Sequence, residues 1–146
     1  MKLKNKAVKG GVLLATFGLM AFFGILHFLF KFVDAPFQKE IFPFFILACI
    51  INYTVSIIVS HWALKAIGKG RNPKVTGLIY TMISLVIVSL LFNMPYSIYA
   101  TVIKLDDLLD NLYIVLFSGA YCFVMGFIPA LFICVPYGLY SNDDLF

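Results

Sequence analysis

The side chains best suited to chemistry lie inside or at the ends of long apolar segments, and they are few. The two histidines, His27 and His61, lie near opposite ends of a predicted bundle, so we do not expect them to share a metal ion. His61 adjoins Trp62, a pairing typical of the membrane interface. We interpret His27 as an interfacial or helix-packing residue, with a proton relay or a pore-lining role as the alternative.

Hydroxyl and amide side chains recur at helical spacing in the second and third apolar segments. They are Asn52, Ser56, Ser60, Thr81, Ser84, Ser89 and Asn93. Such groups usually form hydrogen bonds between membrane helices. A polar path for a solute is the alternative, and the polar intramembrane residues that it would use are His27, Asn52, Ser56 and Asn93.

Acidic side chains are absent from every apolar segment. The sequence has none between Glu40 and Asp106, whereas ion-coupled carriers commonly place a carboxylate at membrane depth. A carboxylate-coupled exchanger is therefore not expected. The three cysteines, Cys49, Cys122 and Cys134, form no CxxC pair, and no nucleophile–base pair is visible. We predict a protein that is not an enzyme and that needs no metal or cofactor.

Small residues recur at steps of four along the last apolar segment. They are Ser118, Cys122, Gly126, Ala130, Cys134 and Gly138. This spacing lets two helix backbones approach closely, so we predict helix packing along this stripe, mainly at its first four members. The partner is an internal helix or a helix of a second subunit. A looser set in the first segment, which could be that partner, is Gly11, Ala15, Gly18 and Ala21.

The segments that must position these residues are typical of a membrane protein. Of the 146 residues, 62% are hydrophobic and 12% charged, against about 45–50% and about 25% in soluble domains. Four runs without charge, each long enough to cross about 30 Å of hydrocarbon, cover residues 10–30, 41–64, 75–103 and 111–142. The first run is longer than the roughly 7–15 apolar residues of a signal peptide.

We therefore predict an all-α, polytopic membrane protein with one membrane domain over residues 1–146, folded as a bundle of four transmembrane helices. The predicted helices cover residues 10–33, 41–65, 73–95 and 112–140. Asn72 is the expected cap of the third helix, with Pro73 at its first position. Beyond Pro95, apolar residues recur at steps of three and four while Lys104, Asp107 and Asn111 fall on the other side. This pattern predicts an amphipathic, interfacial extension of the third helix to residue 110.

Basic residues predict the orientation. One side of the membrane would carry Lys2, Lys4, Lys6, Lys9, Lys65, Lys69, Arg71 and Lys74. The other side would carry Lys31, Lys39 and Lys104. Since the richer side faces the cytoplasm, both termini are predicted to be cytoplasmic.

The same basic residues indicate a lipid partner. We expect Lys65, Lys69, Arg71 and Lys74 to contact anionic lipid headgroups at about 1 kcal/mol each. The net charge of +4 does not indicate nucleic-acid binding, because the basic residues form two short clusters beside apolar runs.

Three short motifs resemble a known family. They are Gly10-Gly11-Val12-Leu13, Arg71-Asn72-Pro73-Lys74 and Val135-Pro136-Tyr137. Together they resemble the YdgK-like family of four-span bacterial inner-membrane proteins, a family with a domain of unknown function. The resemblance covers nearly the whole chain and implies a four-helix fold in the bacterial inner membrane, with no known activity.

Three functions are compatible with this sequence. The leading hypothesis is a small scaffold or accessory subunit that acts by helix–helix contact with a membrane protein partner or in a homo-oligomer. The second is a conduit or transporter for a small solute or a lipid. The third is an immunity protein against a membrane-inserting toxin.

Overall fold

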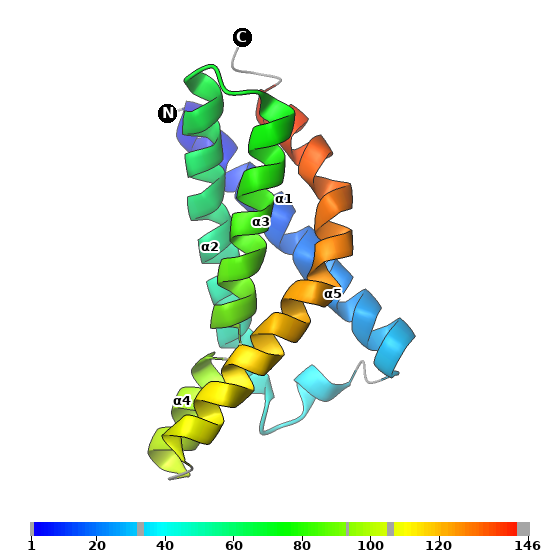
Figure 1. Ribbon diagram of the computed structural model, residues 1–146, viewed down its shortest axis with the longest axis vertical. Helices are drawn as coiled ribbons and strands as arrows, with labels where there is room; N and C mark the ends of the chain where they lie inside the picture. The colour runs from blue at the N-terminus through cyan, green and yellow to red at the C-terminus, as the bar shows by residue number, and fades with distance from the viewer. Residues whose placement is uncertain (1, 32–33, 93, 105–106, 143–146) are drawn as a thin grey trace.

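The computed structural model describes residues 2–31, 34–92, 94–104 and 107–142, and every regular element in this part of the chain is helical (Figure 1). The α-helices are α1 (Lys2–Ile25), α2 (Phe42–Gly68), α3 (Pro73–Leu91), α4 (Met94–Ile103) and α5 (Leu108–Asn142). A π-helical turn, Leu26–Phe30, follows α1, and a 3-10 turn, Ala35–Phe37, precedes α2.

Four stretches of the described chain are long and apolar enough to cross a membrane. They are Asn5–Phe28, Phe42–Gly68, Pro73–Ile103 and Leu108–Ser141. The expectation of an all-helical protein with four such segments is therefore confirmed for the described residues. Most of their large apolar side chains face outward, as the hydrocarbon of a bilayer requires. These four helices indicate a multi-pass membrane protein.

Two helix boundaries illustrate how local sequence sets these elements. Helix α1 begins at Lys2 rather than near residue 10, because the basic leader contains no helix-breaking residue before Gly10. Helix α3 begins as the sequence predicts: Asn72 Oδ1 accepts a hydrogen bond of 3.0 Å from the backbone N–H of Lys74, and Pro73 occupies the first turn.

The predicted amphipathic extension to residue 110 is not one helix. Helix α4 ends at Ile103 and α5 begins at Leu108, so that α4 and the start of α5 lie together at one end of the molecule (Figure 1). Asn111 Nδ2 donates a 2.9 Å hydrogen bond to Thr101 Oγ1, and Ser97 Oγ donates one of 3.4 Å to the Asn111 carbonyl.

Asn111 is therefore buried, and not on the solvent-facing side that the sequence pattern indicated. The apolar side chains of Ile98 and Val102 are instead 61% and 63% exposed. This inside-out arrangement suits a hydrocarbon environment, where polar groups must find partners within the protein.

The four long helices associate as two tight pairs. In the α1–α2 pair, Gly11 lies against the backbone of Ile57, where a Cβ would meet the Ile57 nitrogen at 2.7 Å. In the α3–α5 pair, Gly77 lies against Gly138 and the carbonyl of Cys134. Close approach of backbones at glycine is the usual means of packing membrane helices.

Helix α5 passes through both of its prolines, Pro129 and Pro136. It bends near its middle, in the orange part of Figure 1. Pro129 has no N–H to donate to the carbonyl of Met125, and its ring crowds the preceding turn, which accounts for a bend here. The bend carries the first half of α5 away from α1.

Candidate intramembrane cavity

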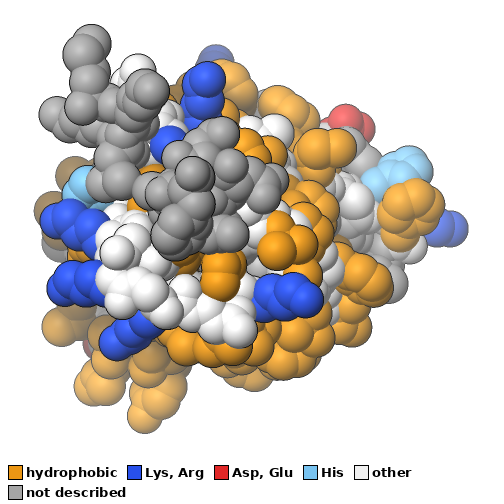
Figure 2. Space-filling view, turned by 90° about the horizontal axis from the view of Figure 1, so that it is seen from above, with side chains coloured by type: hydrophobic (Ala, Val, Ile, Leu, Met, Phe, Trp, Pro, Cys, Tyr) orange, Lys and Arg blue, Asp and Glu red, His pale blue; other side chains and the backbone are white. Residues whose placement is uncertain are grey.

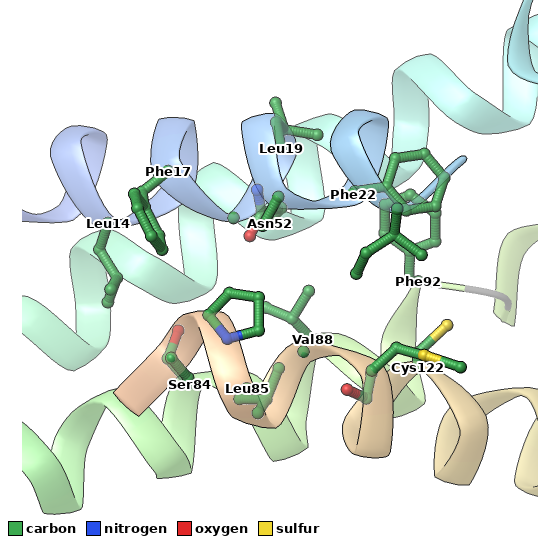
Figure 3. A pocket seen from close by; sticks show the side chains of 18 of the residues that line it. Leu14, Phe17, Leu19, Phe22, Asn52, Ser84, Leu85, Val88, Phe92 and Cys122 are labelled. Carbon is green, nitrogen blue, oxygen red and sulfur yellow. The ribbon is translucent and has the colours of Figure 1, made fainter. Parts of the chain in front are cut away.

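A cavity of about 190 Å³ lies between the two helix pairs, and α1, α2, α3 and α5 all contribute to its wall (Figure 3). Its lining on α2 includes Asn52 and Ser56. Its lining on α3 runs from Thr81 to Ser89 and continues to Phe92, just after the last residue of the helix. Asn52 and Ser56 fall near the middle of α2, and the lining from Thr81 to Phe92 falls near the middle of the apolar stretch Pro73–Ile103. The cavity is therefore at mid-span of the predicted bundle.

Helix α1 contacts α5 near Gly10 and Leu14, beside Tyr137. The far end of α1 and the first half of α5 then run in different directions (Figure 1), which leaves the cavity between them. At the closed end, Leu14 packs with the buried Tyr137 and with Ile133. Farther along, Gly18 of α1 and Tyr121 of α5 line the cavity and are themselves exposed. The space between α1 and α5 is thus open at the side of the bundle, where lipid would lie.

Aromatic rings close the end of the cavity away from Leu14. The rings of Phe22 and Phe92, both in the lining, have centroids 5.4 Å apart. Phe45 of α2 stacks on Phe22 at 6.3 Å and meets Phe92 edge-on at 6.4 Å. These contacts join α1, α2 and α3 where α1 has separated from α5.

The α2–α3 side of the cavity is polar, although the remaining lining is almost entirely apolar. The polar residues on this side, all buried, are Asn52, Ser56, Thr81, Ser84 and Ser89. The hydroxyl oxygens of Ser56 and Ser84 are 3.5 Å apart, a long hydrogen bond. The hydroxyl of Thr81 has no hydrogen-bond partner in the described part of the chain.

Asn52 is oriented by a backbone group of α1. Its amide nitrogen donates a 3.1 Å hydrogen bond to the carbonyl of Ala15. Because a carbonyl only accepts, this bond fixes which end of the amide faces α1. The amide oxygen points the other way, toward the centre of the cavity (Figure 3). Within the described residues, this oxygen accepts no hydrogen bond.

The structure brings together only part of the predicted polar set. Asn52 and Ser56 share the cavity, whereas His27 is exposed in the π-helical turn, with its ring 5.0 Å from that of Phe28. Asn93 lies outside the described residues. The histidine is therefore a poor candidate for lining the same path as Asn52.

The small-residue stripe of α5 faces inward. Cys122, Gly126 and Ala130 line the cavity, and a Cβ on Gly126 would come within 2.6 Å of Leu85 Cδ1 on α3. Ser118 is half-buried and donates a 3.2 Å hydrogen bond to the carbonyl of Val115 in its own helix. Its neighbour Gly119 lies against the carbonyl of Ser89, again on α3. The helix that meets the stripe is thus internal, and it is mainly α3, not α1.

The spacing of Gly18 predicted a helix-packing residue and not part of a cavity. Gly18 lines the cavity, and a Cβ built there would meet no atom within 4 Å. The sequence suggested close packing at Gly18, but the structure has open space beside it. Only the divergence of α1 from α5 reveals this role.

The predicted headgroup-binding residues lie together at the end of the bundle that carries the N-terminus and the α2–α3 connection (Figure 1). Lys65, Lys69, Arg71 and Lys74 are all exposed. Basic side chains gather around this end of the molecule (Figure 2). Among the residues that the structure describes, no group of three His, Cys, Asp or Glu side chains is placed to hold a metal ion.

The chain matches no protein-family model, no curated protein and no solved structure. The resemblance to the YdgK-like family thus remains an expectation. The cavity is the structural feature that bears on function.

Proposed function

We propose that this protein takes up a small, lipid-soluble molecule from the bilayer into the cavity between its helices, as a binding protein or carrier. This is the conduit alternative of the sequence rather than its scaffold alternative. The observation that supports it is a cavity at mid-span that opens at the side of the bundle. Buried polar side chains line its α2–α3 side. Its basic end would face the cytoplasm of a bacterium, with both termini inside and the helices in the inner membrane.

The side chains of the described residues leave the space between α1 and α5 unfilled. Protein interiors pack as densely as organic crystals, and a void forfeits the dispersion contacts of the atoms around it. The side chains around this cavity could fill it if Gly18 and Ala21 were larger, yet both are small. A lipid-soluble molecule that enters through the side opening would supply the missing contacts.

The scaffold hypothesis depended on the small-residue stripe of α5. That stripe meets α3 and the cavity, so it supports a partner helix less directly than a stripe on the outer face would. The immunity hypothesis needs only helix contacts and gains no support from the cavity.

Native mass spectrometry of the protein, extracted in mild detergent from the membranes in which it is made, tests the proposal. We expect a bound molecule on the wild-type protein and on Gly24→Leu. Neither a Cβ at Gly24 nor one at Gly18 would meet an atom within 4 Å, but only Gly18 lines the cavity. Gly18→Leu should therefore lose the molecule by filling its place. Equal occupancy in both variants, or a bare wild-type protein, would argue against uptake into this cavity.

A further inference from the structure

The structure also indicates which chemical class fits the cavity. We propose that the ligand is a neutral molecule with a body the size of one aromatic ring and a hydrogen-bond donor, which Asn52 Oδ1 accepts. This inference rests on the proposed function and specifies its ligand.

Neutrality follows from the lining and its depth. None of the described residues that line the cavity carries a charge. An ion at the middle of a bilayer is strongly disfavoured unless a charged or strongly polar partner compensates it. An anionic or cationic headgroup would find no such partner here, so a phospholipid headgroup is excluded from the cavity.

The volume sets the size of the buried part. An apolar cavity of about 150 Å³ is sufficient to bind benzene, and this one measures about 190 Å³. Phe17, Phe22, Phe92 and Tyr121 supply aromatic surface around it. A ring with one small substituent fits these dimensions, and any longer tail would have to leave through the opening between α1 and α5.

The donor requirement follows from Asn52. Its side chain is only 6% exposed, its nitrogen is held by the Ala15 carbonyl, and its oxygen points into the cavity without a hydrogen bond from the described chain (Figure 3). Buried acceptors are normally satisfied. A ligand hydroxyl or N–H would satisfy this one, whereas a hydrocarbon would not.

Ser89 gives the same side of the cavity a second polar contact. It lines the cavity, is 4% exposed, and makes no hydrogen bond to any described residue. A hydroxyl group can both donate and accept. A ligand O–H or N–H can donate to Asn52 Oδ1, and Ser89 offers a second polar group on the same side of the cavity.

A pair of photoreactive probes of equal shape tests the donor. In phosphatidylcholine vesicles that contain the full-length protein, 4-azidophenol and 4-azidotoluene are activated by light and the adducts are located by peptide mass spectrometry. We expect the phenol to label the cavity-lining parts of α1 and α5 about two- to tenfold more than the toluene, as one buried hydrogen bond would produce. Asn52→Leu should remove this preference while the toluene still labels, which shows that the cavity persists.

The glycine variants separate the two proposals. Gly18→Leu should lower the labelling of the cavity by both probes to the level of the lipid-facing Phe117, while Gly24→Leu leaves it unchanged. If Gly18→Leu does this but Asn52→Leu keeps the phenol preference, the donor inference is wrong and uptake into the cavity stands. If Gly18→Leu changes neither probe, both proposals are wrong.

Discussion

The amide nitrogen of Asn52 lies 3.1 Å from the carbonyl oxygen of Ala15. This hydrogen bond joins the middle of α2 to the middle of α1. Ala15 is fully buried at this point, and the next residue, Thr16, is within 3.1 Å of the Tyr53 hydroxyl. Just beyond these contacts α1 separates from α5. The same asparagine thus fixes α1 against α2 and presents its oxygen to the space that opens beside it.

The glycine contact between α3 and α5 should be important for stability. In Gly77→Ala the added methyl group would lie 2.7 Å from the Gly138 Cα and against the Cys134 carbonyl, so the two backbones must separate. We expect a loss of about 1–3 kcal/mol in unfolding free energy, the usual cost of overpacking, measured by denaturation in mixed micelles. Gly24→Ala, where no atom lies within 4 Å, is the matched control. Equal stability of the two variants would contradict the close approach.

The polar contact between α4 and α5 should hold these helices together. Asn111→Leu removes the 2.9 Å hydrogen bond to Thr101. Such interhelical bonds contribute about 0.6 kcal/mol on average and up to about 1.7 kcal/mol, so hydrogen exchange in α4 should accelerate about three- to twentyfold. Thr54→Val, which loses only a bond to the Ile50 carbonyl of its own helix, should leave α4 unchanged. Slow exchange in Asn111→Leu would show that α4 is held by other contacts.

The proposed orientation predicts which exposed positions react from which side. In a variant whose native cysteines are replaced by alanine, Gly68→Cys should react with a membrane-impermeant maleimide only in inverted vesicles, because a Cβ at Gly68 meets no atom within 4 Å. Phe37→Cys should react only in intact cells, because Phe37 lies in the connection at the opposite end of the bundle. Both positions are exposed, so reactivity reports sidedness. The reverse pattern would invert the proposed topology.

Anionic lipid should be retained by the basic end of the protein. Replacing Lys69, Arg71 and Lys74 with glutamine removes three exposed charges, each contributing about 1 kcal/mol near an anionic surface. We expect less co-purified phosphatidylglycerol in native mass spectra, and a smaller difference at high salt because of screening. The same replacement at Lys31, Lys39 and Lys104 is the control, and it should have little effect. If both triple variants lose equal amounts of lipid, the proposed headgroup contact is wrong.

The sequence predicted the parts of this fold that depend on a local pattern of residues. Four charge-free runs, the Asn72 cap and the small-residue stripe each depend on a local pattern, and the structure has helices, a cap and close packing at these places. The pairing of helices could not be predicted in the same way. The sequence predicted packing stripes both in residues 118–138 and in residues 11–21. In the structure the stripe of α5 packs against α3, whereas Gly18 of α1 faces open space.

The split of residues 94–110 has a similar explanation. An apolar stripe opposite Lys104 and Asn111 fits a helix lying between lipid and water, and it fits equally well a helix whose polar side meets another helix. The hydrogen bonds of Asn111 and Ser97 favour the second arrangement, and they form only after α5 folds back on α4.

The sequence by itself determined a set of four apolar helices suited to a bilayer. It could do so because the cost of placing charge in hydrocarbon acts on each segment separately. Only the tertiary structure decided that α1 leaves α5 at mid-span. That divergence turns Asn52, Ser89 and Gly18 from ordinary helix residues into the wall of one cavity. A cavity belongs to the relative placement of several helices, and no spacing within one helix encodes it.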